Sequence, residues 1–89
     1  MKCTDVAVVN KLGMHARASA KLVSLASSFE SAITVTRDGR TVNGKSIMGI
    51  MMLAAGPGST LKICAEGSDE SAASEALRRL IEQRFGEEG

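Results

Sequence analysis

The chain has 89 residues, of which 44% are hydrophobic and 2% are aromatic, and its formal net charge is +1. This length supplies material for one modest core, so we expect one domain over residues 1–89 and exclude a two-lobed enzyme with a cleft between its lobes. The mixed, nearly balanced charges and the scarcity of aromatic residues argue against nucleic acid or anionic lipid as a partner, because these partners need a basic face or aromatic stacking platforms.

The first predicted element is a strand over Cys3–Val9, which is rich in β-branched residues and stops at Asn10. Its apolar part, Val6–Val9, is too short for a signal-peptide core, so we expect the protein to stay in the cytoplasm. The longest apolar run, around residues 47–55, is well below the ~20 residues that span a bilayer, so we expect no direct membrane insertion.

The two cysteines, Cys3 and Cys64, lie far apart in the sequence and show no C-x-x-C spacing. A reducing compartment also argues against a bridge between them. We therefore predict that both are unpaired and act as small strand residues, with a redox role as the alternative.

The turn after the first strand contains His15, the only histidine of the chain, in the run Asn10-Lys11-Leu12-Gly13-Met14-His15-Ala16-Arg17-Ala18. A helix is predicted over Ala16–Phe29, so His15 would stand where the first helical N–H groups lack intrahelical partners and the helix dipole is positive. A phosphate carried on His15 would meet these donors, and Arg17 would add a guanidinium group. Because a ring nitrogen can attack phosphorus, the arrangement favours a reversible phosphohistidine.

The alternative for His15 is a solvated surface residue or an incidental helix cap. The surrounding sequence offers no second histidine, no cysteine and no acid nearby, so we expect neither a metal site nor a Ser/His/Asp arrangement. If His15 reacts, it reacts without such helpers.

A β-hairpin is predicted next, with residues 33–36 and 40–42 extended on either side of the turn Asp38-Gly39. The segment Gly39–Ser46 also satisfies the P-loop pattern G-x-x-x-x-G-K-S, which makes a small nucleotide-binding protein an alternative of a different class. The hairpin argues against this alternative, because Thr41 and Val42 would lie in the return strand and not in a phosphate-wrapping loop. The chain also lacks a convincing acidic strand that could hold Mg²⁺.

Ser46 is predicted to cap a short helix over Ile47–Leu53, which Gly56-Pro57-Gly58 would end. Met48, Met51 and Met52 put more flexible apolar side chains on this helix than its length can easily bury. Some of them should therefore face solvent and meet partners. The alternative is that the methionines only fill an irregular core.

The last two elements are a strand and a helix. Leu61, Ile63 and Ala65 alternate with polar neighbours, which predicts a strand with one buried side. Asp69 is a candidate N-cap for the final helix, whose apolar residues recur at helical spacing before a polar tail at 87–89: Ala73, Ala76, Leu77, Leu80, Ile81 and Phe85. The order βαββαβα predicts an α+β fold of two layers, a mostly antiparallel sheet with helices on one face.

Two separated segments carry a resemblance to one family. The chain closely resembles the HPr family, the histidine-containing phosphocarriers of the bacterial phosphoenolpyruvate-dependent sugar phosphotransferase system. The resemblance lies in the runs Gly13–Arg17 and Asn43–Met51, in the chain length and in the element order. The similarity covers essentially the whole chain. It implies an open-faced β-sandwich of four antiparallel strands and three helices, and a monomeric phosphoryl carrier that needs no cofactor and has no turnover of its own.

The resemblance also assigns roles to residues. His15 would receive a phosphoryl group from phospho-enzyme I and deliver it to a histidine on an enzyme IIA domain, while Arg17 would position and neutralise the phosphate. Ser46 would be the regulatory site of an ATP-dependent HPr kinase/phosphorylase. Ile47, Met48 and Met51 would form the docking patch for partners.

Ala18 departs from the family pattern, because many members have proline directly after the arginine. Alanine also fits a first helical turn without strain, so the transfer chemistry should survive. The branch stays open, since phosphocarriers of the nitrogen-related regulatory phosphotransferase share the histidine turn, although the segment at Ser46 favours HPr proper. A purely regulatory adaptor without histidine chemistry is a further alternative.

Overall fold

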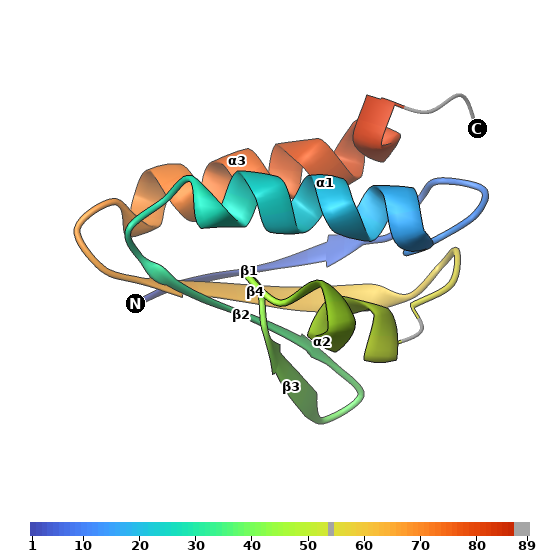
Figure 1. Ribbon diagram of the computed structural model, residues 1–89, viewed down its shortest axis with the longest axis horizontal. Coiled ribbons are helices and arrows are strands. Elements are labelled where there is room, and N and C mark those ends of the chain that lie inside the picture. Colours follow the sequence, from blue (N-terminus) through green and yellow to red (C-terminus); the bar gives the residue numbers. More distant parts are fainter. Residues whose placement is uncertain (54, 87–89) are drawn as a thin grey trace.

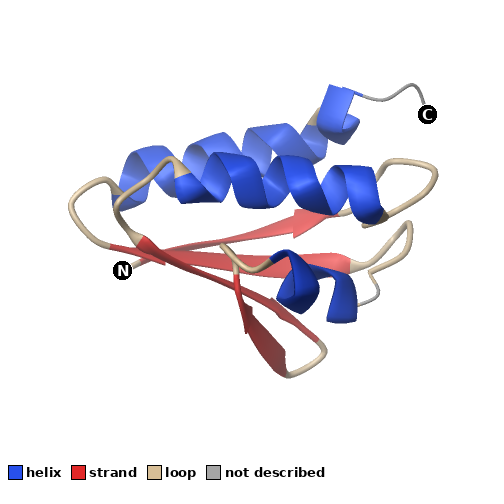
Figure 2. Cartoon of the chain, in the orientation of Figure 1, coloured by secondary structure: helices blue, strands red, loops and turns tan. Residues whose placement is uncertain are grey.

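The computed structural model describes residues 1–53 and 55–86, and within them four strands form one antiparallel sheet (Figures 1 and 2). The polar tail predicted at 87–89 lies outside the described residues. The order across the sheet is β1-β4-β2-β3, so β1 and β3 are its edges. The strands are β1 (Lys2–Ala7), β2 (Ala32–Arg37), β3 (Arg40–Asn43) and β4 (Thr60–Glu66).

Two long helices, α1 (Ala16–Ser27) and α3 (Glu70–Glu82), lie side by side over one face of the sheet (Figure 1). The short helix α2 (Ile47–Met52) contacts α1 and β3. The observed order confirms the predicted βαββαβα arrangement and the α+β fold. In the described part of the chain, no helix is both long and apolar enough to cross a bilayer.

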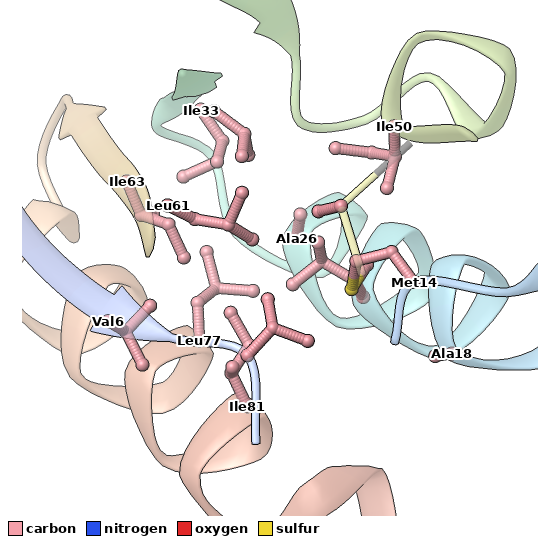
Figure 3. Close-up of a cluster of buried hydrophobic side chains, with 14 of the residues drawn as sticks. Val6, Met14, Ala18, Ala26, Ile33, Ile50, Leu61, Ile63, Leu77 and Ile81 are labelled. Carbon is pink, nitrogen blue, oxygen red and sulfur yellow. The ribbon is translucent and has the colours of Figure 1, made fainter. Parts of the chain in front are cut away.

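The core lies between the sheet and the helices, as the alternation along the strands predicts. In β4, Leu61, Ile63 and Ala65 are buried, while the residues between them face outward. Figure 3 shows strand and helix side chains meeting in one cluster, which includes Val6, Met14, Ala18, Ala26, Ile33, Ile50, Leu61, Ile63, Leu77 and Ile81. Because α2 contributes Ile50, its opposite side is left for solvent.

The prediction of two unpaired cysteines is wrong, because Cys3 and Cys64 form a disulfide. The antiparallel pairing of β1 with β4 places them directly opposite each other, with their Cα atoms 4.0 Å apart. Directly opposite residues of an antiparallel pair place their side chains on the same face of the sheet, which brings the two sulfur atoms together. The cysteines are separated by 61 positions in the sequence, so only the tertiary register brings them together.

The predicted hairpin is confirmed at the segment that matches the P-loop pattern. Asp38 and Gly39 both have positive φ, 50° and 81°, as in the tight turns that suit a two-residue hairpin. Thr41 and Val42 pair with β2, so they belong to a strand and do not form a phosphate-wrapping loop. At Gly44 a Cβ would lie 2.5 Å from Cγ2 of Ile33, so close packing alone accounts for the second glycine of the pattern.

The final helix is shorter than its apolar spacing predicts. α3 ends at Glu82, and a 3₁₀ turn over Arg84–Gly86 follows. Phe85 is buried but does not continue the helix, because Arg84 and Phe85 have positive φ of 58° and 55°. The ammonium group of Lys21 donates to the carbonyl of Phe85 at 2.6 Å, which ties this turn to α1.

Asp69 occupies the predicted N-cap position of α3, but its side chain makes no hydrogen bond to the helix. Its carboxylate instead accepts from the backbone N–H groups of Glu30 at 2.9 Å and Ser31 at 3.0 Å, and from the Ser31 hydroxyl. Glu70 accepts from the N–H of Gly67 at 3.2 Å. Asp69 thus joins the start of α3 to the connection between α1 and β2.

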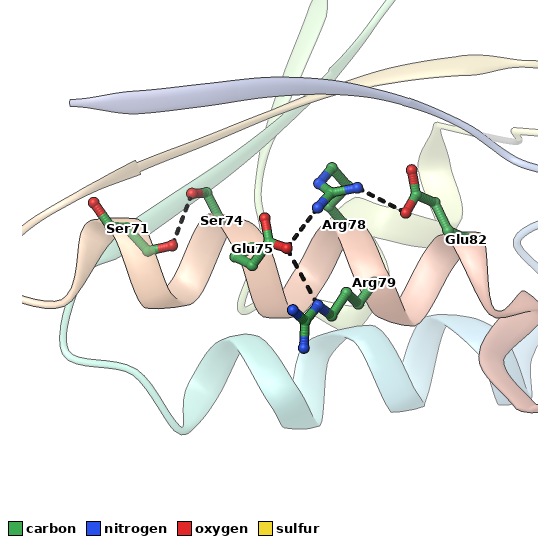
Figure 4. A network of polar contacts seen from close by, with 6 residues as sticks. All are labelled: Ser71, Ser74, Glu75, Arg78, Arg79 and Glu82. Atoms are coloured by element: carbon green, nitrogen blue, oxygen red, sulfur yellow. Dashed lines mark hydrogen bonds and ion pairs between the residues drawn. The ribbon is translucent and has the colours of Figure 1, made fainter.

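The outer face of α3 carries a chain of ion pairs at helical spacing (Figure 4). Glu75 contacts Arg78 at 2.5 Å and Arg79 at 3.2 Å, and Arg78 also contacts Glu82 at 2.8 Å. These side chains are partly exposed, so solvent screens the pairs and each adds little to helix stability.

Candidate functional site

Hydrogen bonds to backbone carbonyls fix the conformation of the turn before α1. The side-chain amide of Asn10 donates to the carbonyl of Gly13 at 2.8 Å, and Met14 donates its N–H to the carbonyl of Ala55 at 2.8 Å. Gly13 has a φ of 63°, and a Cβ there would lie 2.6 Å from the oxygen of Ala55. Glycine is required at this position, both for the left-handed backbone and for the close approach.

His15 stands at the N-cap of α1, as the sequence predicts. Its backbone is extended, with φ of −75° and ψ of 179°, and its carbonyl accepts the first helical hydrogen bond, from Ser19 at 2.8 Å. Its Nδ1 accepts from the backbone N–H of Arg17 at 3.2 Å. The ring is half-buried, and the first turn of α1 contains no acidic residue. A group attached to this nitrogen would therefore lie at the positive end of the helix.

Three basic residues lie near His15 in the sequence. Lys11, Arg17 and Lys21 are all exposed, and Arg17 and Lys21 line a shallow depression along α1. Together they favour an anionic group or an acidic partner at this end of the molecule. No cluster of His, Cys, Asp and Glu residues suited to a metal ion occurs within residues 1–53 and 55–86.

Ser46 caps the short helix α2, as predicted. Its Oγ accepts from the N–H of Gly49 at 3.2 Å, and its side chain is half-buried. The preceding turn is held by Lys45, whose ammonium group donates to the carbonyl of Phe29 at 2.8 Å. At the other end of α2, Arg37 donates to the carbonyl of Leu53 at 2.8 Å, a helix-end contact that local sequence patterns do not reveal.

The predicted docking residues are exposed on one side of α2. Ile47, Met48 and Met51 are 40%, 68% and 43% exposed, whereas Ile50 is 1% exposed. The bond between Met14 and Ala55 brings the His15 turn beside the segment that follows α2, and α1 contacts α2. The structure therefore brings this apolar surface and His15 to neighbouring elements.

Sequence reasoning missed one apolar residue of this region. Leu12 is 69% exposed in the turn before His15. Its position directly before the glycine of the turn is the only signal in the sequence. Met52 is also exposed, so the apolar surface extends beyond the three residues of the predicted patch.

A small open-faced sandwich with a half-buried histidine at the start of a helix is suited to carrying a phosphoryl group, and the chain is similar to known phosphocarriers. The family model for the phosphorylation site of the HPr component of the phosphotransferase system matches residues 2–83. The chain is 57% identical over 83 residues to phosphocarrier protein HPr of Cupriavidus necator, with 93% of each chain covered. It is 51% identical over 88 residues to HPr of Treponema pallidum, covering 99% of this chain and 100% of that one.

Structural similarity extends over the whole fold. A crystal structure of HPr from Thermoanaerobacter tengcongensis superposes with a TM-score of 0.97 at 49% identity, and both chains are covered completely. The chain therefore belongs to the HPr family of the phosphotransferase system, whose members carry phosphate and are not catalysts. A phosphocarrier protein NPr of Shewanella violacea is also similar, at 39% identity over 83 residues, with 93% of this chain and 91% of that one covered.

Proposed function

We propose that this chain accepts a phosphoryl group on His15 from phosphorylated enzyme I and passes it to a histidine of an enzyme IIA domain. The observation that carries the proposal is the N-cap position of His15, whose Nδ1 accepts the N–H of Arg17. Because a carrier must hold its cargo reversibly, it needs a nucleophile, donors for the phosphoryl oxygens and access for partners. All three requirements coincide at the start of α1.

The hydrogen bond from Arg17 supports Nδ1 as the reacting nitrogen. Nδ1 accepts this bond, so its lone pair is directed toward the helix N-terminus. In the transfer, the Arg17 N–H releases this lone pair, which forms a P–N bond while the bond from phosphorus to the donor breaks, and the donor leaves with that electron pair. The phosphoryl oxygens then accept from the N–H groups that begin α1, and the Arg17 guanidinium offsets their charge.

NMR of the phosphorylated protein tests this assignment. After incubation with enzyme I and phosphoenolpyruvate, ³¹P–¹⁵N coupling should place the phosphoryl group on Nδ1 of His15, and the label should be stable in base and lost in acid. Ser27→Ala, which changes an exposed residue at the far end of α1, should be labelled like the wild type. Coupling to Nε2, or label on another residue, would refute the assignment.

Ser46 supports a second part of the proposal, regulatory phosphorylation by an ATP-dependent HPr kinase/phosphorylase. A phosphate at the N-cap of α2 would still accept the N–H of Gly49, so the fold would tolerate it. It would also place about two negative charges beside the apolar surface of Ile47 and Met48. Docking of an acidic partner should therefore weaken more than the fold does.

Two substitutions at Ser46 separate capping from charge. Ser46→Ala should cost about 1 kcal/mol of unfolding free energy, because the cap of α2 is lost, but should leave the rate of phosphoryl acceptance unchanged. Ser46→Asp keeps a capping oxygen and should retain most of the stability, while acceptance from enzyme I falls roughly tenfold through charge repulsion. Urea unfolding and initial rates of labelling give both values. Equal rates for the two variants would contradict the regulatory part.

Two branches of the phosphotransferase system could use such a carrier. We assign this chain to the sugar branch, because the segment around Ser46 resembles HPr and the HPr of Cupriavidus necator is 57% identical, against 39% for the NPr. Labelling rates with the enzyme I of each branch, compared at equal concentrations, test the assignment. Faster labelling by the nitrogen-related enzyme would reverse it.

A further inference from the structure

The disulfide between Cys3 and Cys64 lies on the open face of the sheet, at the end of β1 remote from His15. Along β1 the side chain of Val6 points into the core, whereas Cys3 is exposed, and on β4 Cys64 is half-buried between the buried residues Ile63 and Ala65. Figure 1 shows the N-terminus at one end of the sheet and the start of α1 at the other. The bridge is therefore accessible to reagents in solution without unfolding of the core.

Besides the disulfide, β1 is held by its ladder with β4 and by contacts with α3. The strand lies at an edge of the sheet and pairs only with β4. Lys2, Cys3 and Asp5 are exposed and Thr4 is half-buried, so Val6 is the first residue whose side chain is buried. The amino terminus contacts Glu70 at 3.1 Å, but both groups are partly exposed and such a pair contributes little.

We propose that Cys3 and Cys64 are a reversible redox site whose disulfide holds the N-terminal half of β1 against β4. A thiolate of an external dithiol attacks the exposed Cys3 sulfur and forms a mixed disulfide, and the Cys64 thiolate leaves and takes up a proton. The second thiolate of the dithiol then attacks the dithiol sulfur that is bonded to Cys3, and the Cys3 thiolate leaves. Two electrons thereby pass to the protein, and the dithiol becomes a cyclic disulfide. An external disulfide drives the reverse reaction.

Reduction changes local order and leaves the His15 turn in place. Residues 1–5 lose the covalent tie, while Val6 and Val8 remain in the core and Val8 keeps its backbone bonds to Ser59 and Gly58 at 2.8 Å each. Residues 2–5 are a segment of an edge strand without buried side chains, and such segments open easily. Amide exchange in these residues should therefore accelerate at least tenfold on reduction. Exchange in α1 should stay within a factor of two.

The test compares the oxidised and reduced forms of the full chain. After treatment with oxidised glutathione, the protein should be a monomer that is two mass units lighter than the reduced form and has no alkylatable thiol. Dithiothreitol should restore both thiols. Reduction should lower Tm on the order of 10 °C, because the bridge closes a long loop. Hydrogen exchange with mass spectrometry then locates the change along the chain.

Cys3→Ser and Cys64→Ser are the matched controls, since serine fits both partly exposed positions. Each variant should show the Tm of the reduced wild type and no response to dithiothreitol. Two alkylatable thiols that persist after oxidation, a disulfide-linked dimer as the main product, or exchange at residues 2–5 that is unaffected by reduction would overturn the proposal. Phosphoryl acceptance at His15, measured on the same samples, should be equal in both redox forms.

Discussion

Single residues hold the His15 turn in the position that a carrier needs. Gly13 provides a left-handed backbone and permits contact with Ala55, and Met14 is buried while its carbonyl accepts the hydroxyl of Ser19 at 3.2 Å. These contacts fix the backbone on the N-terminal side of His15, and the start of α1 fixes the other side. The imidazole is therefore presented by a rigid frame, which lowers the cost of orienting it for each transfer.

Gly13→Ala tests this frame. The substitution should lower the free energy of unfolding by about 2 kcal/mol or more and slow phosphoryl acceptance, because the new Cβ combines a strained φ with a clash against a backbone oxygen. Gly39→Ala is a matched control, since Gly39 also has a positive φ but has nothing within 4 Å of its Cβ position. If urea unfolding shows equal losses for both variants, the clash at Ala55 contributes nothing.

Asp69 makes stability depend on pH. The hydroxyl of Ser31 and then the N–H of Glu30 lower the pKa of its carboxyl group, because both bind the charged form. This stabilisation is present above the pKa of an unfolded aspartate, about 4, and is lost as the pH falls through the lower pKa of the folded state. Asp69→Asn should therefore reduce Tm at pH 7, and the gap to the wild type should close toward pH 2. Thermal melts across this range that run parallel would contradict it.

Contacts between elements, and not the local apolar spacing, determine where α3 ends. Apolar spacing in the sequence predicts α3 up to Phe85, but the chain turns into a left-handed backbone at Arg84 and still buries Phe85. The carbonyl of Phe85 then accepts the ammonium group of Lys21 on α1. This turn fastens the end of the chain described by the structure to both long helices.

Phe85→Ala should lower the free energy of unfolding by about 3 kcal/mol, because a fully buried aromatic side chain is removed. Arg84→Ala serves as the control, since Arg84 is exposed and has the same left-handed φ. Urea unfolding monitored by circular dichroism measures both losses. A loss below about 1 kcal/mol at Phe85 would show that the turn is not an anchor.

Local patterns in the sequence predict elements well and contacts between elements poorly. The period of two around Ile63 and the turn at Asp38-Gly39 identify strands and a hairpin because neighbouring residues determine both features. The hydrogen bonds of Asp69 to Glu30 and Ser31 depend on how α3 meets a distant connection, so the local cap rule fails there. For the same reason, Cys3 opposite Cys64 follows from the register of β1 on β4, which neither cysteine's neighbours encode.

The candidate site follows the same division. His15 and Ser46 are predictable because an N-cap depends on a few consecutive residues, and both caps are present in the structure. The exposure of Leu12 and the support of α2 by Arg37 are not predictable, because each depends on segments that are distant in the chain.

The fold places the His15 region and the disulfide at opposite ends of the sheet. His15, the basic side chains around it and the exposed side of α2 gather where β1 ends and α1 begins, whereas the disulfide ties the opposite end of β1 (Figure 1). The sheet between them presents a polar outer face and a buried inner face. A carrier of this design can dock at one end while the other end changes its redox state.

Transfer of a labelled phosphoryl group shows whether His15 is the residue that carries it. With enzyme I, an enzyme IIA domain and radiolabelled phosphoenolpyruvate, the wild-type chain should pass label to the IIA domain. His15→Ala, shown to be folded by circular dichroism, should pass none. Label that still reaches the IIA domain through the His15→Ala chain would contradict the account.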